Sequence, residues 1–358
     1  MRKRQVFFSS VLVLVLAGCD EDGASGDTPA QAYTDFFTAM PQSAAFPPDN
    51  PGSAEKIDLG EKLFWDPILS GRMDVACATC HHPDHGWADA RSTSSGVGGS
   101  GLGASRVGGQ GTRFHSPSVL NAGFTGLTQS PAGADFVSGG YFWDLRADTL
   151  EEQALEPIRS AVEMRSEDFV EDEIIPEVIR RLGAIDEYQN LFANAFDDDE
   201  PISELNIARA LATYQRSLIS RRTRFDAFLL GDSAALTPAE VVGLNKFING
   251  GCANCHSGPM LSDNLIDQAR PVQTDKPAVR TPTLRNVQLT APYFHDGSLR
   301  TLRDAIAFYE ERGDLDVILD EDDFGDIERF LQTLTDSQFP NRVPVSVSSQ
   351  LPVGGNIL

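Results

Sequence analysis

The sequence has 358 residues, of which 41% are hydrophobic and 23% charged, and its 31 glycines and 21 prolines are spread along the chain. This composition excludes collagen-like, low-complexity and largely disordered proteins, and a chain of this length is expected to form two domains. The 52 acidic residues outnumber the 29 basic ones and give a net charge of −23, so a nucleic-acid backbone would be repelled. An acidic surface favours solubility and the steering of a cationic partner protein.

The N-terminus predicts export. A basic cluster at residues 2–4 precedes an apolar stretch at 6–16, which is too short for a membrane-spanning helix. The small residues before Cys19 are typical of a bacterial lipoprotein cleavage site, and an ordinary secretory signal is the alternative. We therefore expect a signal peptide over 1–18, a polar tether over 19–44, and a periplasmic protein that contacts a membrane only through a lipid on Cys19.

Helical patterns dominate the later part of the chain. A long amphipathic helix is expected behind Ser203, with apolar residues at helical spacing from Leu205 to Leu218 and an end near Gly231. A capping box at 237–240 opens another helix, and apolar residues at 324–334 mark a last one.

Strand patterns are nearly absent, so we predict a mainly α fold with two domains, long loops and little strand. We place the N-terminal domain at 45–228, the C-terminal domain at 229–340 and a tail at 341–358. The acidic run 197–200 is expected to be a solvated loop between helices.

Eight glycines fall between Gly96 and Gly111, and Gly96, Gly98 and Gly101 formally match a GxGxxG nucleotide motif. No strand pattern precedes them and no helix pattern follows, so we reject a nucleotide site. We expect a mobile loop over 96–111 instead.

Apart from Cys19, the cysteines form two complete CxxCH motifs. These consist of Cys77, Cys80 and His81, and of Cys252, Cys255 and His256. Two cysteines one helical turn apart can form thioethers to both haem vinyl groups while the adjacent histidine binds the iron. A thioredoxin-like pair or a four-cysteine zinc site is disfavoured, because a histidine follows each pair and the pairs lie far apart. The sequence therefore predicts two covalently bound haems c, one in each of two cytochrome c-like haem domains. The glycine-rich loop is expected to lie beside the first haem.

The residues alone do not identify the second ligand of each iron. The remaining candidates are His82, His85, His115 and His295, with Met40, Met73, Met164 and Met260. A peroxidase differs from an electron carrier in keeping one iron site open beside an acid or base.

Four segments closely resemble the bacterial di-haem cytochrome c peroxidase and MauG family. They are 142–148, the helix that contains Gln153, 162–164, and 281–297, and the resemblance spans residues 45 to 335. It implies an exported peroxidase that reduces hydrogen peroxide to water at the N-terminal haem, with electrons relayed from the C-terminal haem.

The resemblance also implies three catalytic roles. Trp143 matches the tryptophan that relays electrons between the haems, with core packing as the alternative. Gln153 and Glu163 match the pair over the peroxidatic haem, with surface positions as the alternative. A carboxylate there can move a proton from the oxygen that binds iron to the leaving oxygen, so Glu163 is the expected acid–base residue.

Two departures from the family pattern concern the iron ligands. Tyr309 occupies the place of the methionine that binds the second iron in classical members, as in MauG-like proteins, and a core tyrosine is the alternative. A phenolate favours oxidised iron, whereas methionine raises the potential. Val97 occupies the place of a loop histidine that blocks the first iron, so we expect that haem to be open unless His85 or His115 enters.

The family also suggests a calcium ion held by backbone oxygens that map to Thr290 and Pro292, although His115 replaces an expected asparagine.

The expected partners are hydrogen peroxide and a second reactant. That reactant is either a small redox-protein donor, such as a cytochrome c or a cupredoxin, or an oxidisable substrate. A MauG-like oxidase of a protein or small molecule is the nearest alternative. Residues 250–251 are glycines where protein-oxidising members carry a tryptophan, which weighs against oxidation of a macromolecule. A non-catalytic di-haem electron carrier is a further alternative, and a homodimer is left open.

Overall fold

The computed structural model describes residues 29–127, 140–266, 278–312 and 317–358. Within these ranges the chain forms ten α-helices, several short helical turns and one two-stranded hairpin, so the predicted mainly α fold is confirmed. The expected signal peptide and the lipid attachment at Cys19 lie outside the described residues. Across the described ranges, none of the helices is both long and apolar enough to cross a membrane.

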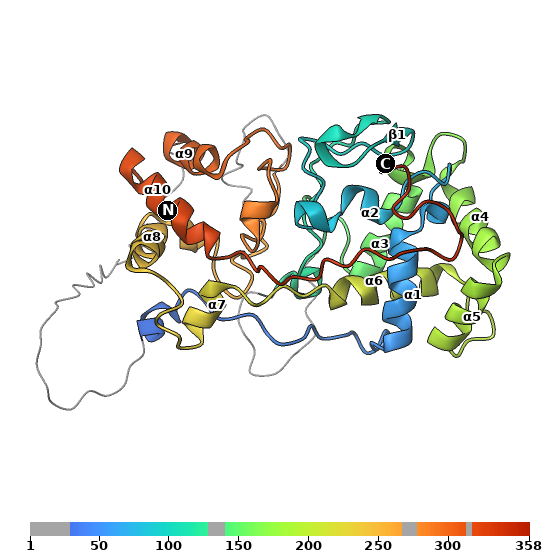
Figure 1. Ribbon diagram of the computed structural model, residues 1–358, viewed down its shortest axis with the longest axis horizontal. Coiled ribbons are helices and arrows are strands. Elements are labelled where there is room, and N and C mark those ends of the chain that lie inside the picture. Colours follow the sequence, from blue (N-terminus) through green and yellow to red (C-terminus); the bar gives the residue numbers. More distant parts are fainter. Residues whose placement is uncertain (1–28, 128–139, 267–277, 313–316) are drawn as a thin grey trace, which may run out of the picture.

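The N-terminal lobe packs long helices around the short helix that carries the first CxxCH motif (Figure 1). Its helices are α1 (Ala54–Trp65), α2 (Cys77–Cys80), α3 (Leu150–Arg159), α4 (Glu171–Gly183), α5 (Asp186–Ala195) and α6 (Glu204–Ser217). Helices α1 and α6 cross closely, because a Cβ at Gly60 would lie 2.2 Å from the Ala210 carbonyl oxygen. Ala78 of the first CxxCH motif packs in the same hydrophobic core as these two helices.

The C-terminal lobe contains α7 (Arg224–Leu229), α8 (Pro238–Asn249), α9 (Leu302–Arg312) and α10 (Glu321–Gln332). The predicted capping box begins α8, since Thr237 caps the helix and Glu240 bonds back to the Thr237 backbone. Three aromatic rings form the centre of this lobe, with Phe330 5.1 Å from Phe225 and 5.2 Å from Phe247. The helices predicted at 238 and 324 are therefore present, and 197–200 is an exposed loop.

The single long helix expected from Ser203 to Gly231 is wrong. Helix α6 ends at Ser217, and a linker separates it from α7. Asp336 accepts bonds from the backbone N–H groups of Arg221 and Arg222, each at 3.0 Å, and these bonds fix the linker in a non-helical path. The break depends on a residue far away in the sequence, which periodicity cannot reveal.

Part of the expected tether 19–44 is packed against the C-terminal lobe. Phe37 is 1% exposed and its ring lies 5.3 Å from that of Phe225. The Met40 N–H donates to Asp226 at 3.0 Å. This segment therefore belongs to the folded body.

The C-terminal segment runs from α10 back across the N-terminal lobe (Figure 1). The Gly354 N–H donates to the Trp65 carbonyl at 2.7 Å, and the Gly354 carbonyl accepts from the Thr79 hydroxyl at 2.7 Å. Thr79 lies between the two cysteines of the first CxxCH motif. The C-terminal segment is thus hydrogen-bonded to the first CxxCH motif and stabilises it.

The glycine-rich stretch forms a hairpin of β1 (Gly99–Ser100) and β2 (Val107–Gly108), where a loop was expected. Arg106 is buried beneath it and donates to the carbonyls of Ser95 at 2.7 Å and Gly96 at 2.9 Å. These bonds define the path of the hairpin.

Candidate functional site

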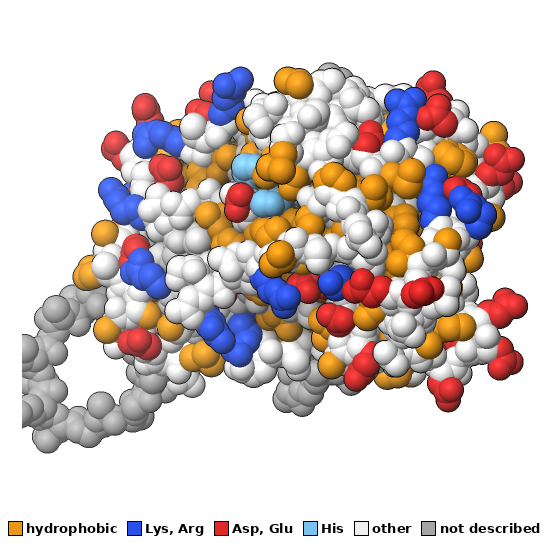
Figure 2. All heavy atoms as spheres, turned by 45° about the vertical axis from the view of Figure 1, so that its right-hand side comes forward, with side chains coloured by type: hydrophobic (Ala, Val, Ile, Leu, Met, Phe, Trp, Pro, Cys, Tyr) orange, Lys and Arg blue, Asp and Glu red, His pale blue; other side chains and the backbone are white. Residues whose placement is uncertain are grey.

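The first CxxCH motif lies on the wall of a cavity of about 470 Å³. The His81 N–H donates to the Cys77 carbonyl at 3.0 Å, which keeps the histidine one turn from the first cysteine. Its Nδ1 lies 3.2 Å from the Trp87 carbonyl oxygen, so Nδ1 carries the proton and Nε2 is the atom available to a metal. The face in Figure 2 has histidine side chains in a hollow among hydrophobic ones.

The second CxxCH motif repeats this arrangement beside a cavity of about 330 Å³. The His256 N–H donates to the Cys252 carbonyl at 3.0 Å, and its Nδ1 lies 3.0 Å from the Leu261 carbonyl oxygen. Each histidine therefore has the tautomer and position that iron ligation requires.

The cysteine environments fit haem attachment. Burial raises the pKa of Cys77 and of Cys252 to about 12, so both thiols are neutral. Among the described residues, no three His, Cys, Asp or Glu side chains are grouped to hold a metal ion. Neutral cysteines on the walls of largely apolar cavities suit thioether bonds to a haem better than a thiolate metal site.

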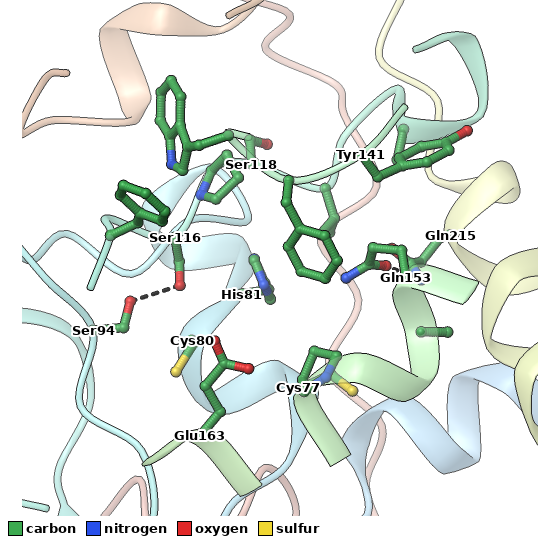
Figure 3. Close-up of a pocket in the computed structure, with 18 of the residues that line it drawn as sticks. Cys77, Cys80, His81, Ser94, Ser116, Ser118, Tyr141, Gln153, Glu163 and Gln215 are labelled. Carbon is green, nitrogen blue, oxygen red and sulfur yellow. Dashed lines mark hydrogen bonds between the residues drawn. The ribbon is translucent and has the colours of Figure 1, made fainter. Parts of the chain in front are cut away.

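Two polar side chains point into the first cavity from different elements (Figure 3). Gln153 extends from α3, where its Oε1 accepts from Gln215 of α6 at 3.4 Å. Glu163 extends from a π-helical turn at Ala161–Arg165, a local form that often occurs at functional sites. Burial raises the pKa of Glu163 against the opposing influence of Arg146, so its carboxyl holds a proton more readily than an exposed one.

The glycine hairpin fixes the backbone of Glu163. The Val97 N–H donates to the Glu163 carbonyl at 3.0 Å. A Cβ at Gly96 would lie 2.0 Å from the Val162 carbonyl oxygen, so glycine is required for this close approach. The hairpin therefore orients the acid–base candidate.

Trp143 lies on the wall that the two cavities share. Its indole Nε1 donates to the His115 carbonyl at 2.8 Å, and its own carbonyl accepts from the Arg280 N–H at 2.8 Å. His295 is buried with its ring 6.4 Å from that of Trp143. The structure thus brings together residues from widely separated parts of the chain.

The second cavity contains Tyr309 on α9, as well as Thr290 and Pro292. The Thr301 hydroxyl caps α9 by accepting from the Asp304 N–H at 3.1 Å. The Tyr309 ring lies 5.9 Å from that of Phe294. Helix α9 thus places Tyr309 in the lining of the cavity that also contains His256.

The other ligand candidates lie in several places. Val97 is buried in the N-terminal core, and His85 packs against Gly103, outside the first cavity. His115 lines both cavities, with its Nδ1 2.7 Å from the Arg91 carbonyl oxygen. Met164 and Met260 line the first cavity, whereas Met73 is exposed.

Three cavity residues were missed by the sequence interpretation. Gln215 supports Gln153, Arg146 lies near Glu163, and Arg280 lines both cavities. Arg280 could have been found from the sequence, because it directly precedes segment 281–297. Gln215 lies within an ordinary helical pattern and gave no such signal.

The fold and the two cavities define a mainly helical protein with two c-type haem sites. The model of the family described as di-haem cytochrome c peroxidase, CCP_MauG, matches residues 54–234. The chain belongs to this di-haem cytochrome c peroxidase and MauG family, and it is a peroxidase oxidoreductase with two haems c.

The chain is 35% identical to the methylamine utilization protein MauG of Methylorubrum extorquens, over 76% of this chain and 74% of that one. It is 33% identical to cytochrome c551 peroxidase of Pseudomonas aeruginosa, over 85% of each. The crystal structure of a MauG-like protein associated with microbial copper homeostasis is similar, with a TM-score of 0.68, 28% identity, and coverage of 83% of this chain and 95% of that one. The resemblance inferred from the motifs is therefore confirmed.

Proposed function

We propose that this protein reduces hydrogen peroxide to water at the His81 haem, with electrons relayed from the His256 haem through Trp143. The observation that carries the proposal is the asymmetry of the two cavities. The first contains both Glu163 and Gln153, the second contains neither, and Trp143 lies on the wall between them.

The haem irons supply the electron-transfer chemistry when bound. Reduction of one peroxide takes up two electrons and two protons and releases two water molecules. Glu163, as a carboxylate, would take the proton from one peroxide oxygen and deliver it to the other. Burial raises its pKa, so the carboxylate is a stronger base than an exposed one. Gln153, held by Gln215, would orient the peroxide by hydrogen bonding.

The second haem would have His256 and Tyr309 as its ligands. Both side chains line the second cavity, which supports this assignment. An anionic phenolate would keep the second haem oxidised at lower potential than a methionine ligand. His85 lies outside the first cavity and the His115 ring is turned toward a backbone carbonyl, which supports an open His81 haem.

The organisation of the whole protein belongs to the same proposal. The peroxidatic domain would cover 45–228 and the electron-transfer domain 229–340, with export to the periplasm and lipid anchoring at Cys19. The donor would be a small cytochrome c or cupredoxin. A calcium ion at Thr290 and Pro292 would need an oxygen ligand where this chain has His115. The His115 ring offers nitrogen and its Nδ1 faces the Arg91 carbonyl, so no step of the proposed reaction involves calcium.

A MauG-like oxidase is the second candidate, and Tyr309 in the second cavity favours it. Both candidates would react with peroxide, but the oxidase would spend the oxidising equivalents on a protein or small substrate. A reduced cytochrome c or cupredoxin supplied as donor distinguishes the two, because only the peroxidase would oxidise it in proportion to the peroxide consumed.

The first test is the optical and electron paramagnetic resonance spectrum of the fully oxidised di-haem protein, before and after one equivalent of peroxide. A high-spin ferric signal that peroxide removes without prior reduction is expected for an open His81 haem. Two low-spin signals that are inert to peroxide, both before and after one-electron reduction, would contradict the proposal and favour an electron carrier.

A further inference from the structure

Arg280 is a half-buried cation on the wall shared by the two haem cavities. Its Nη1 donates to Asn264 Oδ1 at 2.8 Å, and its Nε is buried without a hydrogen-bond partner. In the described part of the chain, no carboxylate forms an ion pair with it. Its environment therefore lacks an anion.

The three fully buried arginines of the described chain are compensated. Arg285 forms two hydrogen bonds with Asp226, at 2.8 and 2.9 Å, and Arg216 forms two with Glu151, at 2.6 and 2.9 Å. Arg106 donates to four backbone carbonyls. Arg280 differs from all three in having a single neutral partner.

A guanidinium whose Nε is buried without a hydrogen-bond partner or a counter-ion is unfavourable. Burial lowers the pKa of Arg280 to about 10, which still leaves the side chain charged at neutral pH. Tyr141 is the nearby titratable group, and burial raises the pKa of its phenol to about 12, so it is neutral. An anion that enters with the cofactor would satisfy the guanidinium.

We propose that Arg280 is the binding residue for a haem propionate carboxylate at the junction of the two cavities. The propionate would come from either the His81 haem or the His256 haem, since the residue lines both sites. The inference rests on the presence of two haems and is independent of the direction of electron relay. A fixed cation beside a haem stabilises its reduced, less positive form, so Arg280 raises the midpoint potential of the haem that it binds.

The test is spectroelectrochemical titration of the di-haem protein with Arg280→Gln. We expect the midpoint potential of one haem to fall by about 59 mV, which is a tenfold change in its ferric-to-ferrous ratio. That potential should also become pH-dependent near neutrality, because an unpaired buried propionate protonates more readily. The haem that shifts identifies the source of the propionate.

Arg113 supplies a matched control, since it lines the first cavity from an exposed position. Arg113→Gln removes the same charge but should shift the potential much less because solvent screens it. Arg280→Lys keeps the charge and should keep the potential while altering the propionate bending modes in resonance Raman spectra. Those modes serve as the readout if Arg280→Gln does not retain both haems.

Unchanged potentials and pH dependence in Arg280→Gln would overturn the proposal, as would unchanged propionate modes in Arg280→Lys. Peroxide consumption measured on the same preparations separates this failure from that of the proposed function. A wild-type protein inert to peroxide would refute the peroxidase assignment alone, because it leaves the potential shifts intact.

Discussion

The indole of Trp143 is bonded to the backbone carbonyl of His115, with 2.8 Å between Nε1 and the oxygen. Both residues line both cavities, and the Arg280 N–H holds the Trp143 backbone from the other side. The ring therefore has one fixed orientation between the two haem sites. Such a fixed aromatic ring is suited to carry electrons between them.

Replacing Trp143 with Phe should slow electron transfer from the His256 haem to the His81 haem, because phenylalanine is much harder to oxidise than tryptophan. The measurement is stopped-flow oxidation of the reduced His256 haem after peroxide is added. The first reaction of peroxide at the His81 haem should keep its wild-type rate. An unchanged oxidation rate at the second haem would mean that Trp143 serves only as core packing.

Replacing Glu163 with Gln should lower kcat/KM for peroxide by about 10²- to 10⁴-fold, the usual contribution of a positioned acid–base group. The charge-matched control is Glu173→Gln, an exposed position on α4, which should leave kcat/KM nearly unchanged. Full activity of Glu163→Gln with both haems present would remove this residue from the mechanism.

The same carboxyl predicts the pH dependence of the reaction. Glu163 must be ionised to accept a proton from peroxide, so kcat/KM should fall as the pH drops through its pKa. Burial raises that pKa, which places this limb at higher pH than for an exposed carboxyl. The limb should be absent from the pH profile of Glu163→Gln.

Gly96 tests the role of the hairpin. The substitution Gly96→Ala places a Cβ against the Val162 and Glu163 carbonyl oxygens, so it should displace the turn that carries Glu163. We expect a loss of about 1–3 kcal/mol in the free energy of unfolding, together with a lower kcat/KM for peroxide. In the same glycine-rich stretch, a Cβ at Gly111 would meet no atom of the surrounding structure within 4 Å, so Gly111→Ala should be nearly neutral in both measurements.

Tyr309→Met should raise the midpoint potential of the His256 haem, because a neutral thioether favours reduced iron more than a phenolate does. Potentiometric titration with optical detection measures the shift. Tyr293→Phe is the control, since Tyr293 lines the same cavity. An unchanged titration and spectrum for Tyr309→Met would argue against ligation.

The ion pair of Asp226 and Arg285 should stabilise the C-terminal lobe. Burial opposes ionisation of Asp226, but Arg285 outweighs it and lowers the pKa of the carboxyl. Asp226→Asn should lower the free energy of unfolding by about 3–5 kcal/mol, since it leaves a buried charge unpaired. Arg180→Gln, which removes an exposed ion pair with Glu177, should change it by less than about 1 kcal/mol.

The Asp226 contribution also has a defined pH dependence. A carboxyl whose pKa is lower in the folded state than in the unfolded state adds stability above its unfolded pKa. That stability is lost as the pH falls through the folded-state pKa. Denaturant titrations at neutral and acidic pH should therefore converge for wild type and Asp226→Asn as the pH is lowered.

The local features of this protein were determined by its sequence. The CxxCH motifs and the Thr237 cap each involve residues within one turn of the chain, so their geometry follows from spacing alone. The helix at 324–334 was predictable for the same reason, since a hydrophobic stripe is a local pattern.

The tertiary structure decided which distant residues meet. It placed Trp143 between the cavities, packed Phe37 into the C-terminal lobe, and positioned Arg280 beside both haem sites. Asp336 broke the helix expected to continue through 218–223. These outcomes depend on packing and hydrogen bonds between segments far apart in the chain, and periodicity and motif spacing carry no information about such contacts.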